Sequence, residues 1–325
     1  MAMNKKGIFF TIISVSLVTV LIFSYVIYNE YRLRDKALVI ETRIDSMNDF
    51  LKDVETDIER GLFISGFRGL LGITQKIINQ GQFIANFPVV FNEIVLNGTI
   101  DGNASPLASD STFGLWVQKM QLQSMKLGIE LNVTNSAVWA AMISPWVIGV
   151  FVNATIQTRD VNSLAGWVRN KTYWTTINIE GFEDPVFAIK SGEFYIRTIH
   201  KTPHKVFSNN INDVTNLLDH MINGYYIAYP AAPDYLMRLQ GDLTNSSSGL
   251  GIESMIDISA LQASIPAGGG FAGLIQNKSV IDHIYWSGWD PQSYRVNFTP
   301  AHVRLDNESE RLIFYNVWNI TYVQP

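Results

Sequence analysis

The most informative absence in this chain of 325 residues is cysteine, of which it has none. A chain without cysteine has no disulfide, no thiolate metal site, no iron–sulfur cluster and no cysteine nucleophile. Because large secreted domains of eukaryotes usually carry disulfides, this absence favours a prokaryotic surface protein. Charge is also sparse, with 16% charged residues and a net charge of -5. This balance argues against nucleic-acid binding, which needs a concentrated basic face.

Common catalytic signatures are missing as well: the sequence contains no G-x-S-x-G, H-E-x-x-H or P-loop motif. Three groupings have the residue types of binding sites. Gly268, Gly270 and Gly273 have the spacing of a dinucleotide-binding loop, but we interpret them as a flexible loop. His200 and His204 have the spacing of helical metal ligands, but Pro203 between them indicates a turn, and we interpret Glu180, Glu183 and Asp184 as a solvated acidic turn. We therefore predict no catalytic residue, no metal and no cofactor, and we expect that the chain is not an enzyme.

Tryptophan, by contrast, is present eight times. Tryptophans on one surface form a platform for stacking sugars, although such side chains more often fill cores and interfaces. The segment Trp286-Ser287-Gly288-Trp289 is the first place to look for such a platform.

The beginning of the chain is strongly apolar. Residues 8–28 carry no charge, and a helix of this length spans roughly the 30 Å of a bilayer core. Lys5 and Lys6 precede the stretch, tyrosines follow it, and no A-x-A-like cleavage site is present. We therefore predict a retained transmembrane helix. Basic residues occur on both sides of it, so charge does not decide its orientation.

The orientation is instead indicated by sequons for N-glycosylation, Asn-X-Ser/Thr with X not proline. The chain has ten among 25 asparagines, all beyond residue 96, where its serine and threonine content predicts about three by chance. Glycans on these sites would place the N-terminus in the cytoplasm and the C-terminal domain outside the cell membrane. The predicted sites are Asn97, Asn103, Asn132, Asn153, Asn170, Asn245, Asn277, Asn297, Asn307 and Asn319.

Residues 29–62 show a heptad pattern. Apolar residues from Leu33 to Ile58 alternate in steps of four and three, with charges between them. No proline or glycine interrupts residues 8–60, so we predict a stalk helix continuous with the membrane span. The seam suits either a self-associating coiled coil or packing on the chain's own next helix. The apolar residues 62–87 favour the second interpretation, a helical hairpin.

The remaining sequence predicts a mixed domain. An amphipathic helix is expected at 113–128, and further helices at 212–229 and 233–241. Strands are expected within 130–158 and 173–199 and at 251–259, 279–289, 294–299 and 311–323. The predicted fold class is α+β: a long N-terminal transmembrane and stalk helix with a helical hairpin, then a mainly antiparallel β ectodomain with inserted helices. The expected divisions are a leader (1–7), the transmembrane helix (8–28), the heptad stalk (29–62) and a glycosylated extracellular domain (63–325).

The start Asn4-Lys5-Lys6-Gly7, followed by IFFTIISVSLVTV, resembles the class III signal of type IV pilin-like proteins. The resemblance covers residues 4–60. It implies cleavage after Gly7, a mature N-terminus at Ile8, and hydrophobic helices that anchor in the membrane before they pack in a filament core. Ile12 stands where many pilins carry a glutamate, which points to a minor component or a simple anchor. The phrases ETRIDSMNDF, DIERGLFISGFRGLL and IEGFEDP resemble archaeal membrane proteins with no assigned activity.

These observations predict a non-enzymatic, single-pass archaeal cell-surface glycoprotein that serves as a minor pilin-like structural or adhesion component. Its expected partners are the lipid bilayer and either further copies of itself or pilus and surface-layer components, and no nucleic acid. The alternative is a membrane-anchored extracytoplasmic enzyme or sensor that acts on surface glycans.

Overall fold

The computed structural model describes residues 5–208, 212–266, 280–288, 293–306, 310–317 and 320–323. These residues form two compact units. The first contains residues up to 56, 120–133 and 156–169, and the second contains 57–119, 134–155 and the chain from 170 onward. Several predicted features lie outside the described residues: Asn277, Asn307, Asn319, Trp289, Trp318 and the glycines at 268, 270 and 273.

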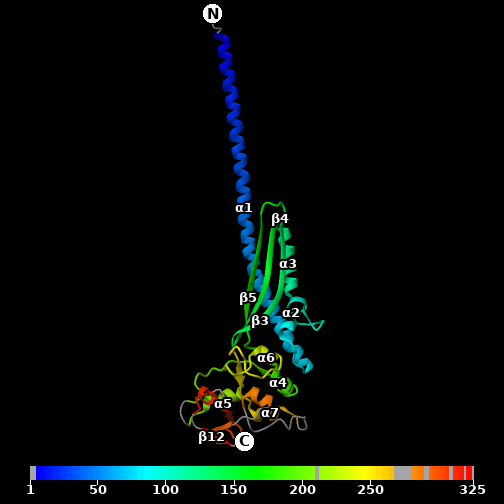
Figure 1. The fold of residues 1–325 in the computed structure, drawn as a ribbon, viewed down its shortest axis with the longest axis vertical. Coiled ribbons are helices and arrows are strands. Elements are labelled where there is room, and N and C mark those ends of the chain that lie inside the picture. Colours follow the sequence, from blue (N-terminus) through cyan, green and yellow to red (C-terminus); the bar gives the residue numbers. More distant parts are fainter. Residues whose placement is uncertain are drawn as a thin grey trace. The chain divides into compact units, whose positions relative to one another are not determined.

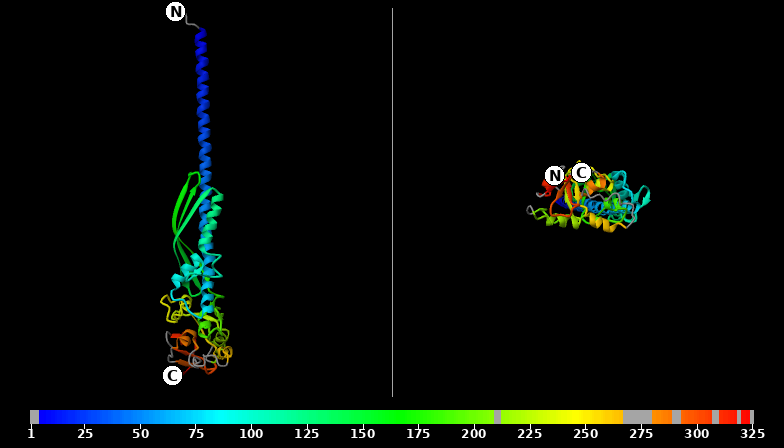
Figure 2. Two further views of the ribbon diagram at one scale, coloured as in Figure 1. Left: turned by 90° about the vertical axis from the view of Figure 1, so that its right-hand side faces the viewer. Right: turned by 90° about the horizontal axis from the view of Figure 1, so that it is seen from below.

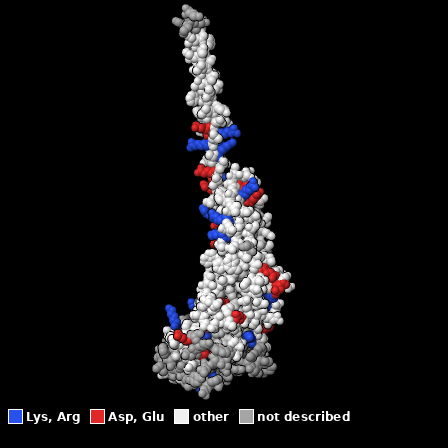
Figure 3. Space-filling view, viewed as in Figure 1, with Lys and Arg blue, Asp and Glu red and all other residues white. Residues whose placement is uncertain are grey.

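Helix α1 runs without interruption from Lys5 to Gln80 (Figure 1). Its 76 residues correspond to about 114 Å at 1.5 Å per residue. The apolar side chains between Ile8 and Tyr28 are exposed, and Figure 3 shows this part of the helix without charged side chains. The helix is long and apolar enough here to cross a membrane. The predicted long N-terminal helix is therefore confirmed.

The predicted helical hairpin is wrong, because residues 62–80 continue α1 instead of forming a second helix. The four glycines between residues 61 and 72 stay helical, and the helix ends before Gly81, which adopts the left-handed conformation (φ 65°). The heptad seam is divided. Its first residues, Leu33, Ala37, Ile40 and Ile44, are exposed, whereas Met47, Leu51, Val54 and Ile58 are buried within the chain.

Two helices follow α1. Helix α2 (Phe87–Asn97) begins with Asn86 as its N-cap and ends at Gly98 in the left-handed conformation. The short strands β1 (Thr99–Ile100) and β2 (Asn103–Ala104) then form an antiparallel pair. Helix α3 (Phe113–Lys126) confirms the amphipathic helix predicted at 113–128. It is tied to α1 by the Trp116 indole, which donates a hydrogen bond to the Asp57 carbonyl (2.9 Å).

Three long strands form a sheet in the order β3-β4-β5 (Figure 1). Their bounds are β3 (Ile129–Ser144), β4 (Val147–Asp160) and β5 (Gly166–Asn178). Alternate residues of β4, among them Val150 and Val152, are buried, as expected for a strand with one covered face. That face meets α1 at Gly66, whose missing side chain lets Val150 and Ile177 approach closely. The strands predicted within 130–158 are confirmed as β3 and β4, whereas β5 begins at Gly166, before the predicted start at 173.

The C-terminal part contains short elements around a second core (Figure 2). Its small sheets are β6-β7, β8-β9 and β11-β10-β12, all antiparallel. The strands are β6 (Glu183–Asp184), β7 (Arg197–Thr198), β8 (Tyr226–Ala228), β9 (Ile252–Ser254), β10 (Ser293–Val296), β11 (Arg304–Asp306) and β12 (Ile320–Val323). The helices are α4 (Pro185–Lys190), α5 (Thr215–Ile222), α6 (Tyr235–Leu239), α7 (Ile258–Ser264), α8 (Asp282–Ser287) and α9 (Arg311–Phe314).

The secondary structure differs from the prediction at several places. The strand predicted at 279–289 is helix α8, the strand predicted at 311–323 begins with helix α9, and α4 interrupts the strands expected before residue 199. The helix predicted at 212–229 ends at Ile222 and is followed by strand β8. Short apolar runs do not distinguish a strand from a buried helix, and all residues from Asp282 to Trp286 are buried. The α+β class with a long N-terminal helix and antiparallel sheets is nevertheless confirmed.

Candidate functional site

The described residues of the second unit line a cavity of about 760 Å³. The end of α4 contributes Lys190, the loop after α6 contributes Asp242, and α8 contributes His283 and Trp286. Arg311 of α9 also lines it. The cavity therefore combines two cationic side chains, an imidazole and an indole with the exposed carboxylate of Asp242.

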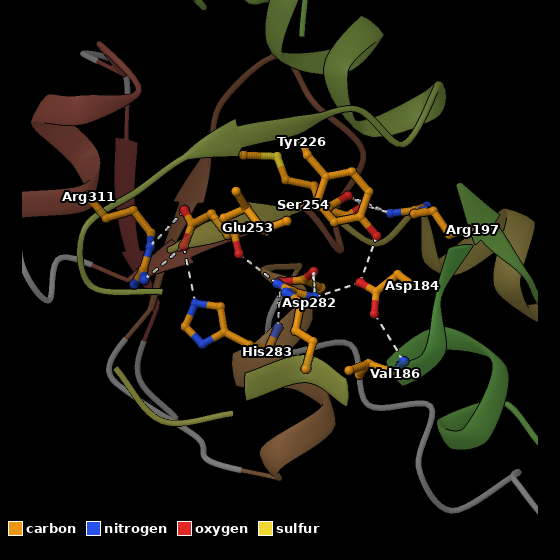
Figure 4. Close-up of polar contacts among 12 residues, drawn as sticks. Asp184, Val186, Arg197, Tyr226, Glu253, Ser254, Asp282, His283 and Arg311 are labelled. Atoms are coloured by element: carbon orange, nitrogen blue, oxygen red, sulfur yellow. Dashed lines mark hydrogen bonds and ion pairs between the residues drawn. The ribbon is translucent and has the colours of Figure 1, made fainter. Parts of the chain in front are cut away.

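Glu253 of β9 lies buried beside this cavity and accepts four hydrogen bonds (Figure 4). The Arg311 guanidinium donates two, to Oε1 at 3.3 Å and to Oε2 at 3.2 Å. The Tyr315 hydroxyl donates to Oε1 at 2.9 Å, and the fourth contact joins His283 Nε2 and Oε2 at 3.1 Å. Burial acts to raise the pKa of Glu253, but Arg311 and His283 outweigh it and lower the pKa to about 2.

A second buried group is centred on Arg238 of α6, whose side chain has no solvent exposure. Its Nη1 contacts Asp184 Oδ2 at 2.7 Å and Asp282 Oδ2 at 3.0 Å. The Tyr226 hydroxyl donates to the same Asp184 oxygen at 2.8 Å. Burial raises the pKa of Asp184 despite Arg238, and the negative charge of Asp282 raises it further.

Strand β9 connects the two groups, because its consecutive residues accept hydrogen bonds from three different arginines. Arg238 donates to the Ile252 carbonyl at 2.7 Å, Arg311 to the Glu253 carboxylate, and Arg197 to the Ser254 hydroxyl at 2.7 Å. Figure 4 shows Arg311 and Arg197 on opposite sides of the strand. Since each unpaired buried charge would be costly, these contacts hold β9 in one position.

The side chains around Glu253 and on the cavity wall suit ligand binding better than proton transfer. Glu253 stays ionised at neutral pH and already accepts four hydrogen bonds, and arginine does not release its proton there. On the cavity wall Lys190 provides positive charge, whereas the charge of Arg311 is paired with the carboxylates of Glu253 and Asp306. The Trp286 indole nitrogen is buried and meets no hydrogen-bond acceptor in the described part of the chain. The cavity therefore suits an anionic or hydroxyl-rich ligand.

The structure does not bring the acidic residues at 180, 183 and 184 or the histidines at 200 and 204 together as a metal site. Asp184 is buried in the Arg238 group, whereas Glu180 and Glu183 are exposed. His204 contacts Asp219 (2.6 Å between Nε2 and Oδ2) in a non-helical segment, as Pro203 indicated. Within the described residues, no group of three or more histidine and acidic side chains is placed to hold a metal ion.

Seven of the ten predicted glycosylation sites lie in the described residues. Six of these asparagines are exposed and Asn297 is half-buried. The exposed ones are Asn97, Asn103, Asn132, Asn153, Asn170 and Asn245. Gly7 and Ile8 at the predicted processing site are also exposed, on the first turns of α1.

Sequence reasoning did not single out Glu253, Arg238, Arg311 or Asp282. The available signal was the placement of charges inside apolar runs, as in GIESMIDI, YLMRLQ and VIDHIYW. A charge flanked by apolar residues in a chain this poor in charge predicts burial with a partner. The identity of that partner follows only from the tertiary structure.

Comparison of the chain with models of protein families, with curated proteins and with solved structures finds no match.

Proposed function

We propose that this chain is a single-pass archaeal cell-surface glycoprotein and a minor type IV pilin-like structural or adhesion component. The observation that carries the proposal is the continuity of α1. Residues 8–28 of the helix form a charge-free, exposed apolar section, and the same helix continues to where its side chains become buried from Met47 onward. A membrane span that continues into a folded domain is the arrangement that the Lys5-Lys6-Gly7 start implies.

The exposed sequons support the topology. An asparagine must be accessible to receive a glycan, and six of the seven described candidates are exposed. With the sites outside, the N-terminus is cytoplasmic and the domain beyond the span is extracellular. The partners are then the bilayer around residues 8–28 and, outside, either further copies or pilus and surface-layer components.

The deciding experiment is mass spectrometry of the N-terminus of the full chain from its native membrane. We expect the chain to begin at Ile8. Gly7→Leu should leave residues 1–7 attached, whereas the control Thr19→Ala, deeper in the same helix, should be processed normally. A wild-type chain that retains Met1 or Ala2 refutes the pilin-like part and leaves an anchored glycoprotein.

Glycopeptide mass spectrometry of the same material tests the topology. Modified asparagines are expected among the ten sequons, and a chain with none modified would refute the glycoprotein assignment. Crosslinking in native membranes then separates the two kinds of partner. Homomeric products indicate assembly of copies, and heteromeric products indicate other surface components.

The cavity beside Glu253 favours one alternative, a sensor or enzyme that acts on surface glycans. Its half-buried Lys190 would donate hydrogen bonds to a hydroxyl-rich or anionic sugar, beside the largely buried Trp286 side chain. Lys190→Ala should then weaken binding of acidic surface oligosaccharides, measured by calorimetry, relative to the control Lys205→Ala. Equal binding by the two variants would remove this alternative.

A further inference from the structure

A row of aromatic rings crosses the three-stranded sheet on its exposed face. Trp139 of β3 and Phe151 of β4 stack with centroids 5.5 Å apart and planes 14° apart. Phe151 and Trp174 of β5 stack at 6.3 Å and 20°. The Trp174 side chain is 52% exposed, and the other two rings are half-buried. The row therefore leaves the Trp174 ring, and part of the other two rings, uncovered by the described chain.

The sequon at Asn153 lies on the same face of β4. Side chains two apart on a strand point to the same side, so Phe151, Asn153 and Thr155 share one face. Asn153 is exposed, and its Cα follows that of Phe151 by about 6.6 Å along the strand. The Phe151 ring itself lies over Gly149, on the other side of its own Cα. The asparagine that would carry the glycan and the hydroxyl residue that completes its sequon thus both lie beside the row.

A neighbouring side chain orients this asparagine. The Thr172 hydroxyl of β5 donates a hydrogen bond to Asn153 Oδ1 at 2.6 Å. The bond engages the amide oxygen, so Nδ2, the atom that is glycosylated, is not used by it. Thr172 itself lies two residues before Trp174 on β5, which places the contact directly beside the end of the aromatic row.

We propose that the N-glycan on Asn153 folds back along β4 and covers the aromatic row with the apolar face of its first sugars. Attachment forms a bond between Asn153 Nδ2 and the anomeric carbon of the first sugar. It breaks the bond of that carbon to a phosphate oxygen of a lipid-linked donor, which leaves with the electron pair, and the amide loses one proton. This inference rests on the proposed glycoprotein function.

The geometry selects a covalently attached sugar over other occupants. A pyranose ring has one face of C–H groups that packs on aromatic rings, while its hydroxyls remain in water. The glycan is tethered one strand repeat from the row, so covering it costs little association entropy. The polar groups of Asn153, Thr155 and Thr172 border the row on the side from which the glycan would arrive and match its hydroxyls.

The test is hydroxyl-radical footprinting of the full chain from an N-glycosylating host, read by mass spectrometry at Trp139 and Trp174. In the glycosylated protein both residues should be protected. Thr155→Val removes the sequon and leaves Asn153 in place. It should raise oxidation of Trp174 about twofold, since a sugar on one side of a ring covers about half of its exposed area.

Three controls keep the test specific. Thr155→Ser retains the sequon and should behave as the wild type. Asn153→Gln should reproduce Thr155→Val, and Asn97→Gln, which removes a sequon outside the sheet, should leave oxidation of Trp174 unchanged.

The outcomes distinguish a failure of this inference alone from a failure of the proposed function. If Asn153 is glycosylated but its loss does not change oxidation of Trp139 and Trp174, the inference is wrong and the glycoprotein assignment stands. The same holds if Asn153 is unmodified while other sequons are occupied. Protection that persists in Thr155→Val indicates another occupant, such as a second copy, and also refutes the inference. If no sequon is occupied, both proposals fail.

Discussion

Replacing Arg238 by methionine is expected to be the most destabilising single change in the C-terminal part of the chain. Arg238 has no solvent exposure and contacts both Asp184 and Asp282. Methionine fills much of the same volume, but it removes the positive charge and leaves two buried carboxylates facing each other. Removing one partner of a buried ion pair costs about 3–5 kcal/mol in unfolding free energy.

This loss is large relative to the stability of a typical domain, which is about 5–15 kcal/mol. For a domain of this size it corresponds to a fall in the unfolding temperature of roughly 6–20 °C. The loss should also depend on pH. In the variant the pKa of Asp184 rises further, so the folded state binds more protons than the unfolded state and stability falls as pH rises through that pKa. The difference from wild type should therefore shrink as pH falls from 7 to 4.

The assay is thermal and urea unfolding of the full chain in detergent, followed by circular dichroism, with Arg295→Met as an exposed control. Adding Asp184→Asn and Asp282→Asn to Arg238→Met should restore part of the stability. Asparagine carries no charge, and at position 184 it still accepts the hydrogen bond that caps α4. The reasoning is refuted if Arg238→Met is no less stable than Arg295→Met, or if its deficit grows on acidification.

Two further changes test the packing. Burial lowers the pKa of His220 to about 3, so protonating it costs the folded state up to about 5 kcal/mol between pH 6.5 and pH 3. His220→Phe should retain more stability at pH 4 than wild type in urea titrations, and parallel pH profiles of the two proteins would contradict this. Gly61→Ala should lower stability by about 1–2 kcal/mol, because the added carbon overlaps the Trp116 ring and the clash exceeds the gain in helix propensity. An unchanged unfolding temperature would show that Trp116 moves away without cost.

Long, regular patterns were predictable because they depend on local chemistry. The long helix was predictable from residue 8 onward because no proline or glycine falls between Ile8 and Arg60. The long strands β3 and β4 were predictable because they are extended runs rich in β-branched and aromatic residues. The end of α1 was not visible, because whether residues 62–80 turn back or continue depends on what packs against them. At Gly66 and Gly61 the neighbours are the sheet and Trp116.

The short C-terminal elements were less predictable. Helix α8 is buried over nearly its whole length, so it shows no amphipathic period that would distinguish it from a strand. The aromatic row also could not be read from the sequence. Trp139, Phe151 and Trp174 are separated by 12 and 23 positions, and only the pairing of three strands places their rings together.

By itself, the sequence determined the apolar N-terminal helix, the α+β class and the set of sequons, because each depends on residues that are close together in the chain. The tertiary structure decided which charges are buried and with which partners. Arg238, Glu253 and Arg311 come from separate elements, and the cost of leaving any of them unpaired appears only once the chain has folded. It also decided that Asn153 lies near a row of aromatic rings, because strand pairing brings Trp139 and Trp174 to Phe151 on the strand that carries this sequon.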